Sequence, residues 1–154
     1  MAAYELDRTD RLILNSLMED AKTTYTKIAQ MIPVSDGTVH VRMKKMEQLG
    51  VVTGSRLIVD YSALGYDLTA YIGIYLEKGS VYKDVIAQLE KVPEIVEAHY
   101  ITGAYSIFCK LICQNTEHLR TILNDQVQAI DGVRRTETFI SLENSIHRSL
   151  KLPV

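Results

Sequence analysis

The stretch VSDGTVHVRMKKMEQLGVV, residues 34–52, decides how the first part of the chain folds. Ser35 is a good helix N-cap, because its hydroxyl is placed to accept a backbone N–H near Thr38. Gly50 is a typical C-cap residue, and Val51 and Val52 begin an extended segment after it. The stretch therefore predicts one short helix that is capped at both ends.

This helix has two different faces. At 3.6 residues per turn, four apolar residues fall on one side, and the opposite side is polar, basic and lightly built. The apolar residues are Val39, Met43, Met46 and Leu49, and the opposite residues are Gly37, His40, Val41, Lys44 and Lys45. A solvated surface helix has the same pattern, so the helix alone does not decide between solvent and a partner.

The segment before the helix favours a partner. Residues 24–32 predict another short helix, capped by Thr24, and only Pro33 and Val34 separate it from Ser35. Two short helices joined by a tight corner form a helix-turn-helix, whose second helix enters the major groove of DNA. We expect these residues to contact DNA, with Lys45 and Arg56 at the phosphates: Ser35, Gly37, Thr38, His40, Val41, Lys44, Lys45 and Arg56.

Neighbouring segments complete a first domain over residues 1–60. A helix over residues 6–20, with Asp7 as its N-cap, would brace the helix-turn-helix. Arg42 lies near the apolar side of its helix, so we expect a structural role and a pairing with an acid such as Asp10. Two β-prone runs in residues 51–59 flank a turn and predict a hairpin, which makes the domain winged. Residues 61–65 form the hinge.

From residue 66 onward the hydrophobic period changes, which predicts a second domain over residues 66–154. The expected elements are strand 68–76, helix 81–92, strand 95–102, strand 105–113, helix 116–130 capped by Thr116, and strand 133–142. This βαββαβ order is the ferredoxin-like arrangement. The fold class is therefore α+β, a winged helix-turn-helix followed by a ferredoxin-like domain.

Both faces of the predicted sheet are apolar. In the third strand Tyr105, Ile107, Cys109 and Leu111 share one side, and Phe108 and Ile112 share the other. Two helices cover only one face of such a sheet, so a monomer would expose too much apolar surface. We therefore expect the open face to pack against a second chain in a two-fold homodimer.

Composition and charge restrict the function. The chain has 154 residues, is 47% hydrophobic, and contains no apolar run near the roughly 18 residues needed to cross a bilayer. No secretory segment opens it, so we expect a cytoplasmic protein without membrane contact. Cys109 and Cys113 would lie about 13 Å apart along a strand, which predicts free thiols. The histidines are scattered singly, so no metal and no cofactor are expected.

The net charge of −2 argues against DNA binding by bulk charge. Few phosphate contacts per chain mean weak binding per chain, so useful affinity would require several copies on one DNA. Oligomerisation is therefore part of the DNA-binding hypothesis.

Four motifs together resemble the Lrp/AsnC (feast/famine) family of transcription regulators. They are LDRTDRLIL at 6–14, SDGTVHVRMKKMEQLGVV at 35–52, TGAYS at 102–106 and RTETFISLE at 135–143. The resemblance covers nearly the whole chain and is nearest to the asparagine-responsive branch. It implies dimers that assemble further, commonly to octamers, and an amino-acid effector, with asparagine as first choice, bound between dimers.

The same resemblance implies an effector site in the second domain. Carried over by position, its residues are Tyr100, Thr102, Gly103, Ala104, Tyr105, Ser106, Gln128, Thr136, Glu137 and Thr138. Backbone N–H groups near Gly103 can hold a carboxylate, and Gln128 or Glu137 can bind an ammonium or an amide. Many members carry acids where this chain has Ala104 and Ser106, and often a glycine where Pro33 stands.

Two other classes of function were compared with the regulator. An enzyme is not expected, because the sequence shows no nucleophile with a base, no paired carboxylates in a defined pocket, no phosphate loop and no metal set. The alternative is an amino-acid-binding oligomerisation module without sequence-specific DNA binding, which the near-neutral first domain and Pro33 would allow.

Overall fold

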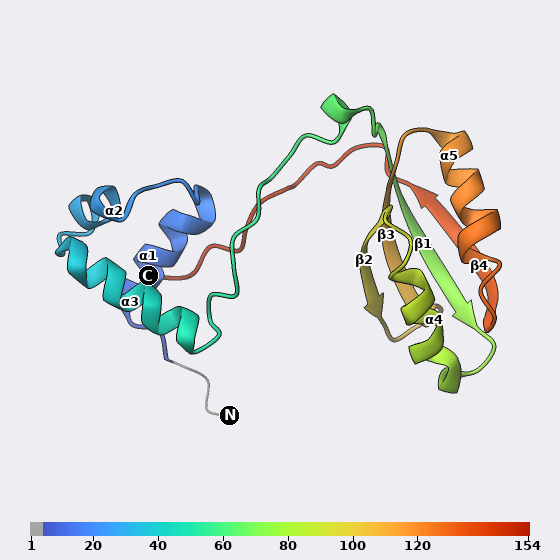
Figure 1. The fold of residues 1–154 in the computed structure, drawn as a ribbon, viewed down its shortest axis with the longest axis horizontal. Helices are drawn as coiled ribbons and strands as arrows, with labels where there is room; N and C mark the ends of the chain where they lie inside the picture. Colours follow the sequence, from blue (N-terminus) through green and yellow to red (C-terminus); the bar gives the residue numbers. More distant parts are fainter. Residues whose placement is uncertain (1–4) are drawn as a thin grey trace. The chain divides into compact units, whose positions relative to one another are not determined.

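Three helices form the N-terminal unit of the computed structural model, which describes residues 5–154 (Figure 1). They are α1 (Arg8–Glu19), α2 (Tyr25–Met31) and α3 (Asp36–Gln48). The side chains of Asp7, Thr24 and Ser35 each accept a backbone N–H three residues further on. The three predicted N-caps are thus confirmed, and each places its helix start at the expected residue.

The core of this unit comes from all three helices. It consists of Ile13, Leu14, Ile28, Ala29, Val39, Met43 and Met46. Pro33 lies in the corner between α2 and α3, where the next N–H, that of Val34, donates to the carbonyl of Ala29 at 3.1 Å. The corner therefore closes without an N–H from the proline.

The end of α3 differs from the prediction at one residue. Leu49 was expected on the apolar side but is 52% exposed, because it is the C-cap residue and the chain turns away there. Gly50, the residue directly after this C-cap, has φ +70°, a conformation that favours glycine. Gly50 thus ends the helix, as predicted.

The predicted wing is wrong for this chain. No strand forms between residues 51 and 60, and every residue from Thr53 to Val59 is exposed. An uncovered two-stranded hairpin is only marginally stable, because neither of its faces is buried. Arg56 therefore lies on an extended segment rather than on a hairpin.

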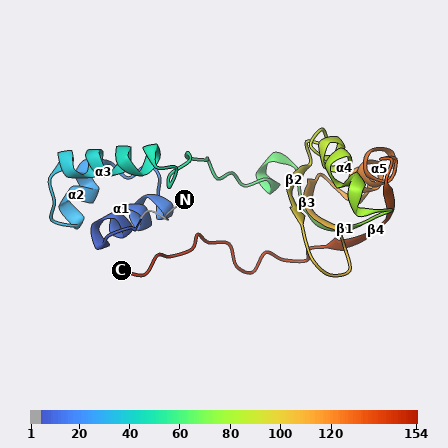
Figure 2. The same ribbon diagram turned by 90° about the horizontal axis from the view of Figure 1, so that it is seen from below.

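A four-stranded sheet and two helices form the second unit, Val59–Ser145. The strands are β1 (Leu68–Leu76), β2 (Ile95–Tyr100), β3 (Ile107–Cys113) and β4 (Val133–Ile140), in the order β2-β3-β1-β4 with every pair antiparallel. Helices α4 (Tyr82–Leu89) and α5 (Thr116–Thr121) cover one face, as Figures 1 and 2 show. This arrangement confirms the ferredoxin-like prediction.

The helix predicted over residues 116–130 differs from the observed one in two details. Its cap is the side chain of Asn115, not Thr116, because the Asn115 carboxamide oxygen accepts the N–H of His118. After α5 the helix continues as η3 (Ile122–Val127), a segment of π-helix. Such segments are rare and often occur at functional sites.

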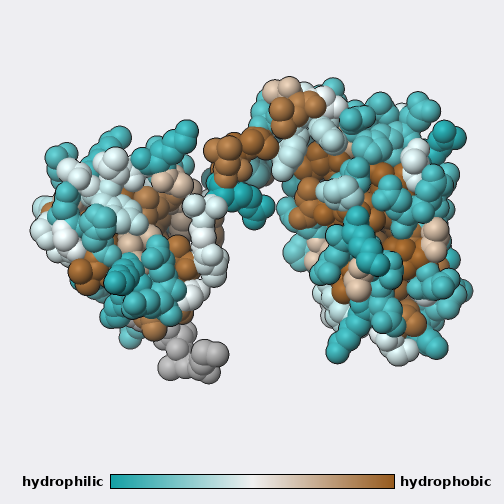
Figure 3. Space-filling model, viewed as in Figure 1, coloured by the Kyte–Doolittle hydropathy of each residue, from teal (hydrophilic) through white to brown (hydrophobic). Residues whose placement is uncertain are grey.

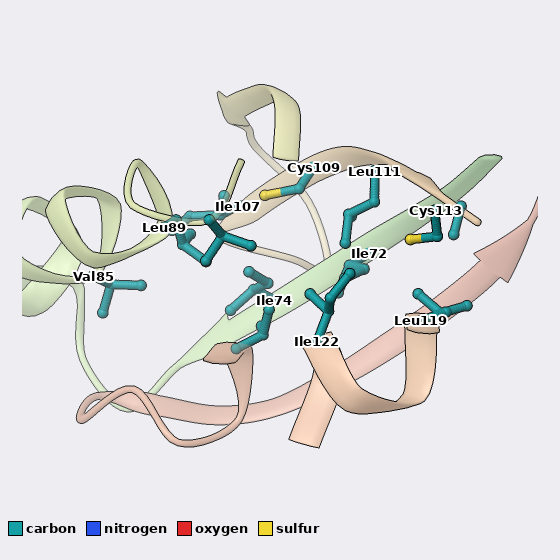
Figure 4. Packing of buried hydrophobic residues seen from close by; sticks show 13 residues of the cluster. Ile72, Ile74, Val85, Leu89, Ile107, Cys109, Leu111, Cys113, Leu119 and Ile122 are labelled. Carbon is teal, nitrogen blue, oxygen red and sulfur yellow. The ribbon is translucent and has the colours of Figure 1, made fainter. Parts of the chain in front are cut away.

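Apolar side chains fill the space between the sheet and its helices (Figure 4). Ile72 and Ile74 of β1 face Ile122 of the helical layer, and all three are fully buried. The two cysteines lie in the same core as free thiols, as predicted, and burial raises the pKa of each to about 11.

The opposite sheet face carries aromatic rings. Tyr71 and Phe108 stack with ring centroids 5.7 Å apart, and Phe139 lies 6.4 Å from Phe108. Tyr105 was predicted on the side of Ile107 but packs on this open face instead, 6.0 Å from Phe108. The reason is that Tyr105 precedes β3, so strand alternation does not govern it, and its ring lies across Gly73.

The two ends of the chain belong to one unit. Residues 146–154 group with the N-terminal helices, whereas the sequence suggested that all of 66–154 would belong to the second domain. The extended segment before β1 exposes Leu57 and Ile58 at 72% and 80%. Figure 3 shows exposed brown, hydrophobic atoms along this part of the chain. Among the described residues no helix has the length and apolarity to cross a membrane.

Gly73→Ala should destabilise the second unit. A Cβ at Gly73 would lie 2.5 Å from Cδ1 of Tyr105, so the ring must leave its place, at a cost of about 1–3 kcal/mol in urea unfolding. Gly79→Ala is the matched control, because a Cβ there meets nothing within 4 Å. In a Tyr105→Ala background the cost at Gly73 should shrink, and an unchanged cost would contradict this packing.

Candidate functional site

The polar face of α3 is directed away from its own core. Six of the predicted DNA-contacting residues of α3 and its cap are exposed, and Thr38 is half-buried. The exposed residues are Ser35, Gly37, His40, Val41, Lys44 and Lys45. Val41 is 69% exposed, which suits an apolar contact with a thymine methyl group in the major groove.

Arg42 fixes how this face is oriented. Its Nη1 atom donates to Oδ1 of Asp10 at 2.8 Å and to Oδ2 of Asp7 at 2.5 Å. Asp10 is 1% exposed, so its carboxylate requires these donors inside the unit. The predicted pairing of Arg42 with Asp10 is confirmed, and Asp7 is a second partner that the sequence did not indicate.

Asp7 has two roles in this network. Its carboxylate caps α1 and also accepts from Arg42. The backbone N–H of Asp10, and then the Arg42 guanidinium, hold the pKa of Asp7 below its ordinary value. Hydrogen bonds to the carboxylates of Asp7 first and Asp10 second raise the pKa of Arg42. One arginine of α3 is thereby tied to both acids of the α1 capping box.

The first turn of α3 is also held by α2. Thr26 donates its hydroxyl to Oδ2 of Asp36 at 2.7 Å, and the rings of Tyr25 and His40 meet edge to face with centroids 4.6 Å apart. These contacts fix the end of α3 that would reach base edges in a groove. Arg56 is exposed on the extended segment, and the structure does not bring it to α3 through a hairpin.

The predicted effector residues lie on both edge strands of the sheet, β2 and β4. Tyr100, Ile107, Ile74 and Thr136 lie in one row across the four strands. Strands are about 4.8 Å apart, so Tyr100 and Thr136 are separated by about 14 Å. This backbone separation exceeds the length of a small amino acid.

On the helix-covered side, two predicted residues meet. The Gln128 amide nitrogen donates to the Thr136 hydroxyl at 2.9 Å, and Gln128 is exposed. Tyr100 lies at the other edge, with its ring 4.3 Å from that of Tyr82. Thr138 lies on the same side as Thr136 in β4, two residues away, and is exposed.

On the open face, Tyr105 and Glu137 meet. The Tyr105 hydroxyl donates to Oε2 of Glu137 at 2.7 Å, and the Tyr75 hydroxyl donates to Oε1 at 3.0 Å. Arg135 forms an ion pair with the same Oε1 at 3.0 Å. Hydrogen bonds from Tyr105 first and Tyr75 second lower the pKa of Glu137, while the Glu137 carboxylate raises the pKa of Tyr105. Sequence reasoning missed Tyr75, although the alternation of Tyr71, Gly73 and Tyr75 could have indicated it.

The turn between β2 and β3 is exposed and closed by backbone bonds. Thr102, Gly103 and Ala104 are all exposed, and Gly103 has φ +117°. The N–H of Ile101 donates to the Ser106 carbonyl, and the N–H of Ser106 donates to the Ile74 carbonyl. The turn therefore stands at the end of β1, with its own N–H groups open to a ligand or a neighbouring chain.

Comparisons with known proteins match both units. Residues 6–47 match the AsnC-type helix-turn-helix domain, and residues 69–150 match the Lrp/AsnC ligand binding domain. Regulatory protein AsnC of Escherichia coli (strain K12) is 44% identical over 151 residues, which cover 98% of this chain and 99% of that protein. Regulatory protein AsnC of Haemophilus influenzae is 43% identical, with 96% and 99% covered.

A solved structure of E. coli AsnC is similar along the whole chain. It aligns with a TM-score of 0.92 at 43% sequence identity, and covers 97% of this chain and 100% of that one. The similarity therefore includes the helical unit, the sheet unit and the segment that connects them.

Arg42→Met should destabilise the N-terminal unit. The carboxylate of Asp10, buried to 1% exposure, loses its guanidinium partner, which costs about 1–3 kcal/mol at pH 7 in urea unfolding. Arg8→Met, at an exposed arginine of α1, is the control and should change stability little.

The difference between wild type and Arg42→Met should depend on pH. The folded pKa of Asp7 is lowered, so its contribution is complete above the unfolded pKa of about 4 and is lost as pH falls through the folded value. Urea unfolding between pH 7 and pH 3 should show the difference narrowing on the acid side. A difference that stays constant would contradict the role of Asp7.

Proposed function

This chain belongs to the Lrp/AsnC family of transcription regulators, and we propose that it controls transcription in response to asparagine bound between its copies. Its relatives are regulators and not enzymes, and its two units are a DNA-binding helix-turn-helix and a domain that binds a small-molecule ligand. The operator contacts and the identity and placement of the ligand are our proposals.

The observation that carries the DNA-binding proposal is the Arg42 network. It holds α3 so that Val39 and Met43 stay in the core, while the face with His40, Val41 and Lys44 remains open. In this arrangement the first turn of α3 meets base edges and the lysines meet phosphates. Ser35, Gly37, Thr38, Lys45 and Arg56 complete the proposed contact set.

For the effector we propose a site that two copies complete. Tyr100 and the turn residues Thr102, Gly103, Ala104 and Ser106 would hold one end of the ligand, and a neighbouring copy would bring Gln128, Thr136 and Thr138 to the other. The separation of about 14 Å between the edges of the sheet supports this, since one small amino acid cannot span it. A carboxamide ligand suits Gln128 and Thr136, because an amide both donates and accepts hydrogen bonds.

Glu137 has a different place in this proposal. Its carboxylate already accepts hydrogen bonds from Tyr75 and Tyr105 and forms an ion pair with Arg135, so a ligand ammonium would have to compete with them. We therefore assign Glu137 and Tyr105 to the shaping of the open sheet face. The ammonium would then be bound by backbone carbonyls of the Gly103 turn.

Assembly follows from the same surfaces. Family membership implies oligomers, and we propose a homodimer through the aromatic sheet face and a tetramer of such dimers. A regulator that binds chromosomal DNA and a metabolite acts where both are found, so we propose a cytoplasmic protein that uses no metal.

Lys44→Ala/Lys45→Ala should weaken operator binding and flatten its salt dependence. Each lost phosphate contact lowers the slope of log K against log salt by about 0.9 in gel shifts with the chain's own upstream region. Lys78→Ala/Lys83→Ala, at two exposed lysines of the second unit, removes the same charge and should leave the slope unchanged. An unchanged slope in the α3 variant would remove this face as the DNA surface.

Gln128→Ala should reduce the asparagine response without reducing basal DNA binding. One lost hydrogen bond to the ligand costs about 1–1.5 kcal/mol, so the asparagine concentration that gives half the response should rise about tenfold. Gln126→Ala, at an exposed glutamine two residues earlier, is the control. Equal responses in both variants would exclude Gln128 from the site.

A further inference from the structure

The C-terminal segment, residues 146–154, makes specific contacts with helix α1. The Asn15 side chain pairs with the backbone of Leu152 in both directions: its Nδ2 donates to the Leu152 carbonyl at 2.9 Å, and its Oδ1 accepts the Leu152 N–H at 2.8 Å. A carboxamide that pairs with both polar groups of one residue fixes the register of that segment.

Further contacts lie on both sides of this pair. Arg11 donates from Nη1 to the Pro153 carbonyl at 3.3 Å, and the Ser149 hydroxyl donates to the Met18 carbonyl at 3.4 Å. The Leu152 side chain packs against the core of the helical unit. Positions 11, 15 and 18 share one face of α1, so a single strip of the helix receives the whole segment.

This strip differs from the other surfaces of α1. Ile13 and Leu14 are buried in the core, and Asp10 is taken up by Arg42 of α3. Arg11 and Asn15 are half-buried, and their side chains form hydrogen bonds with the C-terminal segment. The strip recognises an extended peptide by its backbone and by one apolar side chain.

We propose that this strip of α1 is a docking site for the C-terminal peptide of this chain, and that docking ties the ligand-binding unit to the DNA-binding unit by a second connection. The first connection is the extended segment before β1. The second starts directly at the end of β4, the strand that carries Thr136 and Thr138.

The consequence for DNA binding rests on the proposed function. A unit held by two connections samples fewer orientations than a unit held by one flexible linker. When several copies bind one DNA, each docked unit has less freedom to lose, so the complex forms at a lower entropic cost. The hydrogen bonds of the docked segment all go to α1, and the polar face of α3 stays exposed, so docking changes affinity without changing the phosphate contacts.

Asn15→Ala and Leu152→Ala in the full chain test the docking. Amide hydrogen exchange at Leu152 should be protected in the wild type and accelerate at least tenfold in Asn15→Ala. Both variants should bind operator DNA several-fold more weakly with an unchanged salt slope. Leu150→Ala is the matched control, because Leu150 lies in the same segment and is 78% exposed.

The outcomes separate the two proposals. A wild-type Leu152 amide that exchanges as fast as an unstructured peptide would overturn docking. Fast exchange in Asn15→Ala with DNA affinity equal to wild type would overturn the second connection. If the wild type fails to shift DNA at low salt, the proposed function fails, and exchange at Leu152 still decides docking.

A peptide experiment tests the same site in trans. The synthetic peptide IHRSLKLPV, residues 146–154, should bind a chain that ends at Ser145 and should not bind that chain when it carries Asn15→Ala. Circular dichroism of the truncated chain verifies its fold beforehand. Equal binding to both truncated chains would contradict recognition by Asn15.

Discussion

The ion pairs of Arg42 with Asp7 and Asp10 are the constraint on which the DNA-binding unit depends. Helix α3 has 13 residues, too few to be stable alone, so tertiary contacts must decide its rotation. Apolar packing tolerates small rotations, because one methyl group can replace another. The buried carboxylate of Asp10 does not tolerate such a rotation, because a rotation of α3 that moved Arg42 away would leave the carboxylate without its guanidinium partner.

A comparable constraint organises the ligand-binding unit. Gly73 lets the Tyr105 ring lie flat on the sheet, and from there the Tyr105 hydroxyl reaches Glu137. Two tyrosine hydroxyls and Arg135 satisfy the Glu137 carboxylate, so this charge can lie within the aromatic face that we propose as the dimer interface. Phe139 on this face is 45% exposed in the single chain, and a second copy packed there would bury it.

Local rules predicted what local contacts decide. The caps of α1, α2 and α3, the two hydrophobic periods and the βαββαβ order followed from residues near one another on a helix or strand. The pairing of Arg42 with Asp10 joins two helices, and it was predicted because Arg42 lies near the apolar side of α3. The wrong predictions depended on tertiary contacts. The predicted hairpin after α3 does not form, because no other element packs on residues 53–59, and Tyr105 does not follow strand alternation, because its ring packs over Gly73. Docking of Leu152 on Asn15 joins residues 137 apart in sequence, which no period can indicate.

In the function that we propose, neither DNA binding nor effector binding is complete in one chain. Arg42 is occupied by two acids, so the outward charge of α3 rests mainly on Lys44 and Lys45, too little for tight binding to DNA by one copy. The candidate effector residues are likewise divided between two edges of the sheet. If neighbouring copies complete both sites, ligand and DNA each favour particular assemblies over others. Their binding is then coupled through assembly, and by reciprocity DNA must change the affinity for the ligand as much as the ligand changes the affinity for DNA.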